Sequence, residues 1–252
     1  EIASCLVGSE MCIRDSAKCA CPWHPLPPRA SHPQSLRHCM QATRIVAIRH
    51  GETAWNVDTR IQGHLDIPLN DTGLWQAAQV AQALVGEPIA AIYSSDLQRA
   101  HATAQAVART TGAPLKTEPG LRERSFGHFQ GRTFAEIEAE LPQDALRWRK
   151  RDPHYTPEGG ESLVTLRDRI ERTVTALAQQ HVGEQVVMVA HGGVLDVLYR
   201  LATRQDIQAP RTWQLANAAI NRLLWTPDGL TLVGWADTQH LDQIVVRDEN
   251  HA

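Results

Sequence analysis

Several residue types are scarce in this chain. Aromatic residues make up only 5% of the 252 residues, and all five cysteines lie within the first 39 positions. The remaining chain therefore has no thiol nucleophile and no disulfide framework, which suits the cytoplasm. It also contains no apolar run long enough to cross a membrane, so we expect no membrane partner.

Several sequence motifs of catalytic sites are also missing. There is no Gly-x-x-x-x-Gly-Lys-Ser/Thr loop, no His-Glu-x-x-His pair and no dense carboxylate cluster. We therefore predict that the protein uses neither a metal ion nor a cofactor. A Ser-His-Asp hydrolase is poorly supported, because the Gly-x-Ser-x-Gly elbow is absent and the stretch after Gly160 does not complete it.

The first 39 residues differ in composition from the rest. They hold five prolines between Pro22 and Pro33, show no apolar periodicity and begin at Glu1 rather than methionine. Residues 4–16 resemble a translated sequencing-adapter remnant. We predict a non-native or disordered extension over 1–39 and a single domain over 40–252, with Met40 as the natural start.

The charge balance of the predicted domain is slightly acidic. Four basic and three acidic side chains lie in residues 1–39, which leaves 21 basic and 25 acidic side chains for residues 40–252. A net charge of about minus four disfavours a nucleic-acid partner, since such proteins usually present an excess of lysine and arginine.

Hydrophobic patterns alternate along the chain between short apolar runs and longer amphipathic segments. We predict strands at 43–49, 89–93, 185–190, 220–225 and 230–235, and helices at 72–85, 95–110, 133–140, 143–150, 162–181 and 193–201. Ser95 and Gln98 match a capping box that would open the second helix. Strands that alternate with helices predict an α/β fold with a mostly parallel, doubly wound sheet.

Two predicted strands end in the same way. Arg49, His50 and Gly51 follow one apolar run, and His191 with two glycines follows another. The edge where parallel strands end is the usual place for chemistry in α/β proteins. The arginine carries a permanent positive charge in a planar fork that matches phosphate oxygens. The pair His50 and His191 therefore predicts one shared site for an anion.

These motifs, taken in order, resemble the histidine phosphatase superfamily, in its phosphoglycerate-mutase-like branch. The resemblance covers about residues 43 to 240 and rests on a set of matching stretches: 49–53 with 55–56, 62–63, 66–70, 94–100, 121–124 with Gly127, 159–162 and 190–193. It implies a three-layer α/β/α sandwich with its site at the carboxyl edge of the strands.

The resemblance also assigns roles to individual residues. It implies that His50 forms a phosphohistidine, that Glu123 is the general acid, and that Arg49, Arg99 and His191 stabilise charge on the transferred phosphoryl group. Further phosphate-binding residues implied are Asn56, Gln62, Gly63 and Gly192. The implied partner is a small phosphorylated metabolite, and the resemblance is compatible with a homodimer.

Three functions can be considered for these residues. The predicted one is a phosphomonoester hydrolase, and the alternative is a 2,3-bisphosphoglycerate-dependent phosphoglycerate mutase. The short segment between Glu123 and His191 and the absence of a lysine after Gln130-Gly131 favour the hydrolase. A non-catalytic phosphate binder would be expected to have lost one of the key side chains. The basic run 147–151 is interpreted either as a solvated helix face or as a lid over the substrate.

Overall fold

The computed structural model describes residues 42–244, so the predicted extension 1–39 and the predicted start at Met40 lie outside the described residues. One sheet of six strands runs in the order β3-β2-β4-β1-β5-β6. The strands are β1 (Thr43–Arg49), β2 (Ala91–Ser94), β3 (Leu115–Thr117), β4 (Gln185–Ala190), β5 (Ile220–Thr226) and β6 (Gly229–Asp237).

The central strands β1 and β4 determine where the site lies. They pair in parallel, and their register aligns Arg49 with Ala190. His50 and His191 are the next residues of the two strands, so they leave the sheet side by side at the same edge. Every residue of β4 is buried, as expected for a strand covered on both faces.

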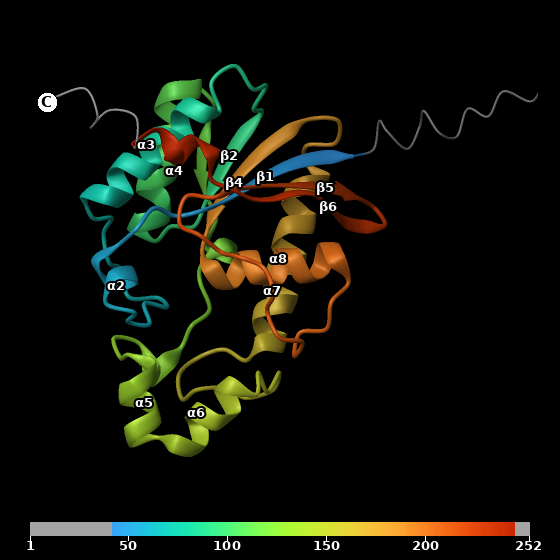
Figure 1. The fold of residues 1–252 in the computed structure, drawn as a ribbon. Coiled ribbons are helices and arrows are strands. Elements are labelled where there is room, and N and C mark those ends of the chain that lie inside the picture. Colours follow the sequence, from blue (N-terminus) through green and yellow to red (C-terminus); the bar gives the residue numbers. More distant parts are fainter. Residues whose placement is uncertain (1–41, 245–252) are drawn as a thin grey trace, which may run out of the picture. The chain divides into compact units, whose positions relative to one another are not determined.

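Helices cover both faces of the sheet (Figure 1). Their bounds are α2 (Ala54–Val57), α3 (Asp71–Ala83), α4 (Gln98–Thr111), α5 (Phe134–Glu140), α6 (Pro142–Arg149), α7 (Leu163–Gln179) and α8 (Gly192–Thr203). Three short 3-10 helices are η1 (Pro119–Leu121), η2 (Gly127–Phe129) and η3 (Gln239–Ile244). One apolar core lies beneath α7 and α8, and a second lies beneath α3 and α4. The layers are therefore helix, sheet and helix.

Helices α5 and α6 stand apart from these layers (Figure 1). They pack around a small apolar cluster of their own, built from Phe129, Ile137, Ala145 and Tyr155. This subdomain, residues 126–155, is inserted between the segment that carries Glu123 and helix α7. Its apolar cluster is separate from the two cores that cover the sheet.

The predicted α/β sandwich with a mostly parallel sheet is confirmed. Strands β1 to β4 pair in parallel, and only β5 runs in the opposite direction, pairing antiparallel with β1 on one side and with β6 on the other. All five predicted strands and all six predicted helices are present, with shifts at their ends. Helix α2 and the short strand β3 were not predicted, because four and three residues are too short for a periodic signal.

The predicted capping box at Ser95 was wrong. Helix α4 begins at Gln98, and its N-cap Leu97 offers no side-chain cap. The Ser95 hydroxyl accepts from the Leu97 N–H at 3.3 Å, and the Gln98 N–H donates instead to Asp66 Oδ1 at 2.7 Å. A distant carboxylate thus replaces the local cap, and this ties the loop before α3 to the start of α4.

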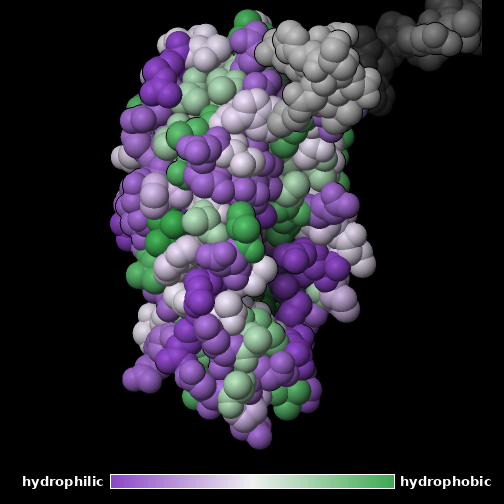
Figure 2. Space-filling view, turned by 60° about the vertical axis from the view of Figure 1, so that its left-hand side comes forward, coloured by the Kyte–Doolittle hydropathy of each residue, from purple (hydrophilic) through white to green (hydrophobic). Residues whose placement is uncertain are grey.

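Within residues 42–244, no helix combines the length and the apolar character that a membrane span needs. The face seen in Figure 2 mixes hydrophilic and hydrophobic residues, and the hydrophobic ones form scattered patches.

Candidate active site

His50 lies buried at the end of β1, with only 3% of its surface exposed. Its Nδ1 is 2.7 Å from the carbonyl oxygen of Gly51. Because a carbonyl can only accept, Nδ1 carries the proton, and Nε2 is left with a free lone pair. The hydrogen bond to the backbone therefore leaves the lone pair of Nε2 unused.

The backbone of His50 is held from a distant loop. The Asn217 amide Nδ2 donates to the carbonyl of His50 at 2.9 Å, and the Ala218 N–H lies 3.3 Å from the same oxygen. On the other side the His50 N–H donates to Ala190 of β4 at 3.0 Å. Asn217 was missed at the sequence level, because no local pattern marks an asparagine that acts across the fold.

His191 occupies the N-cap position of α8, and its ring lies beside that of His50. The two ring centroids are 5.2 Å apart and the ring planes are tilted by 58°. Both ring nitrogens of His191 are buried and make no hydrogen bond within the described part of the chain. Buried polar atoms without partners are rare in proteins, so these two are suited to a bound ligand.

Both histidines are neutral. Burial lowers the pKa of His50 well below its usual value, and the positive charges of Arg49 and Arg99 lower it further. Burial likewise lowers the pKa of His191, with added effects from Arg99, His50 and Arg49. A neutral imidazole is what a nitrogen nucleophile requires, since a protonated ring has no lone pair.

Arg99 is almost fully buried in the first turn of α4, with 1% of its surface exposed. Its Nη1 donates to the Leu65 carbonyl at 2.9 Å and its Nη2 to the Gly63 carbonyl at 2.7 Å. Its Nε is buried without a partner among the described residues. Burial lowers the pKa of Arg99 to about 10, which still leaves the side chain cationic at neutral pH.

Arg49 supplies a second cation next to His50. Its Nη1 donates to the Leu215 carbonyl, while its Nε is buried and unpartnered within the described residues. Burial lowers the pKa of Arg49, the nearby Glu123 raises it, and Arg211 lowers it. Because neither Arg49 nor Arg99 forms a salt bridge with a carboxylate in residues 42–244, their positive charge remains available to an anion.

Glu123 faces these groups from the segment between η1 and η2. Its carboxylate accepts from the Gly193 N–H at 3.1 and 3.0 Å and from the Arg124 N–H at 2.7 Å. Its carbonyl lies 2.8 Å from Nε2 of His64. The start of α8 thus carries His191 at its N-cap position and binds the carboxyl group of Glu123 through the Gly193 N–H.

The two glycines after His191 have different surroundings. A Cβ at Gly193 would lie 2.2 Å from Glu123 Oε1, whereas a Cβ at Gly192 would lie 3.6 Å from Arg49 Nε, an ordinary contact. A Cβ at Gly193 would therefore displace the Glu123 carboxylate from its present position, whereas one at Gly192 would not. Gly192 was predicted to bind phosphate, and it lies between Arg49 and Glu123.

The other predicted binding residues lie in the loops around Arg99 and His50. The carbonyl of Gly63 holds Arg99, and the Oε1 of Gln62 is buried without a partner in the described part of the chain. Asn56 Oδ1 accepts from the Thr53 N–H at 3.1 Å and from Asn217 Nδ2 at 3.2 Å. Its Nδ2 makes no hydrogen bond with any residue between 42 and 244.

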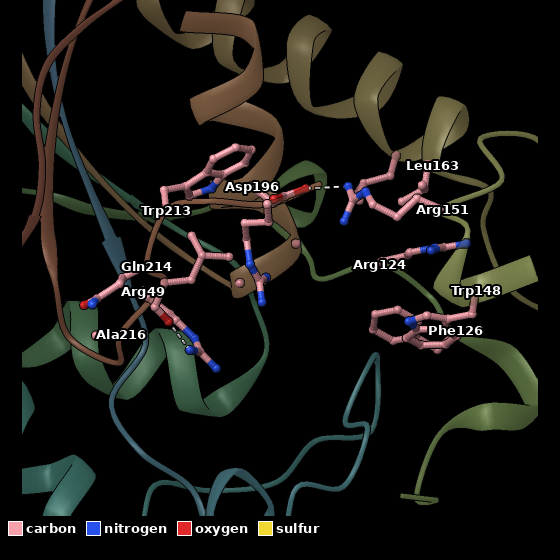
Figure 3. Close-up of a pocket in the computed structure, with 15 residues that line it drawn as sticks. Arg49, Arg124, Phe126, Trp148, Arg151, Leu163, Asp196, Trp213, Gln214 and Ala216 are labelled. Carbon is pink, nitrogen blue, oxygen red and sulfur yellow. Dashed lines mark hydrogen bonds and ion pairs between the residues drawn. The ribbon is translucent and has the colours of Figure 1, made fainter. Parts of the chain in front are cut away.

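A cavity of about 680 Å³ opens next to Arg49 and the two glycines. Figure 3 shows Trp213, Gln214 and Ala216 on one side of it and Arg124, Phe126 and Trp148 on the other. The rings of Phe126 and Trp148 stack at 5.0 Å. Cations and flat rings thus line a space beyond the histidines.

The basic run 147–151 has residues both at the cavity and at the surface. Trp148 and Arg151 line the cavity, and Arg151 Nη2 donates to Asp196 Oδ2 at 2.8 Å. Arg149 instead pairs with Glu138 at 2.6 Å, and Lys150 is exposed. The run therefore presents Trp148 and Arg151 to the cavity and Arg149 and Lys150 to solvent.

No group of three or more metal-ligating side chains is found within the part of the chain that the structure describes. The cations nearest to His50 are the guanidinium groups of Arg49 and Arg99.

Comparison with known proteins identifies the family. Residues 45–238 match the model of the histidine phosphatase superfamily, branch 1. The chain is 40% identical over 204 residues to phosphoglycerate mutase-like protein 4 of Arabidopsis thaliana, which covers 79% of this chain and 87% of that protein. It is 38% identical over 208 residues to the metal-independent phosphoserine phosphatase of the same plant, covering 81% and 85%.

A solved structure agrees with these sequence matches. The mycobacterial glucosyl-3-phosphoglycerate phosphatase has a TM-score of 0.69 and 32% identity, over 78% of this chain and 100% of that one. Matches of this extent to both sequence and structure show common descent, and the chain belongs to branch 1 of the histidine phosphatase superfamily.

Proposed function

We propose that the protein is a metal-independent phosphomonoester hydrolase in which His50 is the nucleophile and Glu123 the general acid. The observation that carries the proposal is the free Nε2 of a buried, neutral His50 that lies among Arg49, Arg99 and His191. The relatives named as phosphatases support it.

The first chemical step transfers the phosphoryl group to the protein. The lone pair of His50 Nε2 attacks phosphorus while the bond between phosphorus and the ester oxygen breaks. Glu123 donates its proton to that leaving oxygen, which departs as an alcohol. Arg49, Arg99 and His191 stabilise the negative charge on the equatorial oxygens, the main task in a loose transition state.

The second step restores the enzyme. A water molecule attacks phosphorus on the side opposite His50, and Glu123, now ionised, takes up its proton. The bond between phosphorus and Nε2 breaks, and inorganic phosphate leaves. His50 regains its lone pair, and Glu123 is protonated again by the proton taken from the water.

The substrate is a small phosphorylated metabolite, as it is for the relatives. One relative is named for phosphoserine and another for glucosyl-3-phosphoglycerate. Each of these two compounds is a phosphate ester of a small organic molecule. The cavity of about 680 Å³ is large enough for the non-phosphate part of such a compound. A domain without cysteine after residue 39 supports the cytoplasm as the place of action.

The phosphohistidine is tested by trapping it. A brief reaction with a ³²P-labelled substrate is expected to give acid-labile label on the wild-type protein and none on His50→Ala, which is also expected to lose turnover. His181→Ala is a matched control, because its ring contacts Tyr93 and Glu184 away from the site. Normal turnover by His50→Ala would rule out this nucleophile.

The hydrolase is separated from the mutase by the fate of the phosphoryl group. We expect phosphate release from simple monoesters without bisphosphoglycerate, unchanged by EDTA. We expect little interconversion of 3- and 2-phosphoglycerate in an enolase-coupled assay. Isomerisation that bisphosphoglycerate stimulates, and that is faster than phosphate release, would replace the hydrolase with the mutase.

A further inference from the structure

The segment that carries Glu123 has few means of fixing its own shape. Residues 122–125 lie between η1 and η2 outside any strand or regular helix. The backbone carbonyls of Gly120, Arg122 and Glu123 therefore need partners from elsewhere in the fold, since partly buried carbonyls are almost always hydrogen-bonded. All three find the same partner.

That partner is Arg169, in the middle of α7. Its Nη1 donates to the carbonyls of Gly120 at 2.8 Å and Arg122 at 2.9 Å, and its Nη2 donates to the carbonyl of Glu123 at 3.2 Å. The two remaining donors bind a carboxylate: Nε is 2.9 Å from Glu161 Oε1 and Nη2 is 2.8 Å from Glu161 Oε2. Arginine has five N–H donors in a rigid fork, and all five are in use.

Arg169 and Glu161 together form a backbone frame for the segment that carries Glu123. Glu161 extends this frame to Ser125, at the other end of the segment. Its Oε2 accepts from the Ser125 N–H at 3.1 Å, and its own N–H donates to the Ser125 carbonyl at 2.8 Å. Its carbonyl accepts from Arg124 Nε at 2.8 Å. The pair Arg169 and Glu161 thus contacts the backbone on both sides of Glu123, with the Glu161 and Arg169 side chains 16% and 20% exposed.

The charge state of Glu161 suits this frame. Burial raises the pKa of Glu161, but the hydrogen bonds and charge of Arg169 and the Ser125 N–H outweigh it, and the pKa ends below its usual value. The carboxylate therefore stays ionised at neutral pH and can accept from both arginine nitrogens.

The frame and the helix start at α8 hold opposite ends of Glu123. Arg169 and His64 bind its carbonyl, and the Gly193 N–H binds its carboxyl group. A proton donor needs its oxygen within hydrogen-bond distance of the leaving atom, and a displacement of about 1 Å can cost about 100-fold in rate. The backbone frame determines whether that distance is met.

We propose that Arg169 and Glu161 are positioning residues for the general acid, and that they set the distance from the Glu123 carboxyl to the leaving oxygen. This inference rests on the proposed function, in which Glu123 protonates that oxygen. It predicts one effect that a purely structural role does not. Loss of the frame slows the hydrolysis of esters with poor leaving groups selectively, because only these leaving groups need a proton.

The test compares two substrates on the full chain. We expect Arg169→Gln to lower kcat for an alkyl ester such as glycerol 3-phosphate about 10- to 100-fold, and for p-nitrophenyl phosphate less than about 3-fold. Glu161→Gln keeps the shape of the side chain and is expected to show the same split at smaller size, so the test survives if Arg169→Gln folds poorly. Arg172→Gln is the matched control, an exposed arginine on the same helix that is expected to change neither substrate.

A double variant makes the assignment specific. Glu123→Gln removes the acid and is expected to show the largest split. Adding Arg169→Gln to it should cause no further selective loss on the alkyl ester, because there is no proton left to position. Equal losses on both substrates in Arg169→Gln and in Glu161→Gln, beside a clear split in Glu123→Gln, would overturn the positioning role and leave the proposed function intact. No split in Glu123→Gln itself would overturn the general acid and the positioning role together.

Discussion

The phosphate end and the cavity end of the active site are built in different ways. At the phosphate end, His50, His191 and Arg99 are 3%, 0% and 1% exposed. Backbone carbonyls of neighbouring loops orient His50 and Arg99. At the cavity end, arginines and aromatic rings come from the α5–α6 subdomain and from the loop before β5, and Arg211 is exposed.

This difference separates chemistry from specificity. The phosphate end is part of the sheet edge and shares its two cores, so a change there disturbs a rigid arrangement that every substrate uses. The cavity end is attached to that edge by a few contacts, such as the ion pair between Arg151 and Asp196 at 2.8 Å. Variation at the cavity end can therefore change which ester binds while the transfer step stays the same.

The largest effect is expected from Arg99→Lys at the phosphate end. Lysine keeps the charge but loses the planar fork, which binds two carbonyls and leaves the buried Nε without a partner among the described residues. We expect kcat to fall about 10²- to 10³-fold on every phosphate ester, including p-nitrophenyl phosphate. Steady-state kinetics measure this fall in kcat, and circular dichroism checks that the variant is folded. A loss restricted to bulky esters would place Arg99 functionally with the cavity.

The next effect concerns the two glycines of α8. In Gly193→Ala the new Cβ would meet Glu123 Oε1 at 2.2 Å, so the carboxyl must move. We expect kcat on alkyl esters to fall about 10- to 100-fold. Gly192→Ala is the control, since its Cβ would sit 3.6 Å from Arg49. Equal kinetics for the two variants would contradict the tight fit between Glu123 and α8.

The stability of the phosphate end is expected to depend on pH. Burial holds the pKa of His50 and of His191 below the usual value of 6.5, so the unfolded chain takes up protons first as the pH falls. The stability from each neutral histidine is complete above pH 6.5 and falls by about 1.4 kcal/mol per pH unit below it.

Urea denaturation between pH 7.5 and 5.5 measures this loss. His191→Asn is expected to flatten the slope, because one of the two buried titrating groups is gone. His128→Asn is the control, since His128 is half-buried within η2 and is not in contact with the rings of His50 and His191. A slope that stays unchanged in His191→Asn would show that other groups cause the pH dependence.

The smallest effect is expected at the cavity end. Arg211 lines the cavity and forms no salt bridge with any residue in the described range 42–244. We expect Arg211→Gln to leave kcat for p-nitrophenyl phosphate within about 2-fold and to raise KM for esters with a second anionic group about 3- to 10-fold. A large fall in kcat on the small ester would show that the two ends do not act separately.

Local patterns in the sequence predicted what lies at the phosphate end. A short apolar run followed by His-Gly is readable without any structure, and the parallel pairing of β1 and β4 then brings His50 and His191 together. Short elements such as α2 were missed because four residues carry no period. The capping box at Ser95 was wrong, because Asp66 from a distant loop satisfies the start of α4 instead.

The sequence by itself determined the order of strands and helices, the two strand-end histidines and the absence of thiol chemistry after residue 39. Only the tertiary structure decided which nitrogen of His50 is free, how Glu123 is held and which part of the run 147–151 meets the cavity. The physical reason is range: periodicity and turn residues act between near neighbours in the chain. The carbonyl groups that Arg169 and Asn217 bind lie about 50 and 167 positions away, where no local pattern records the contact.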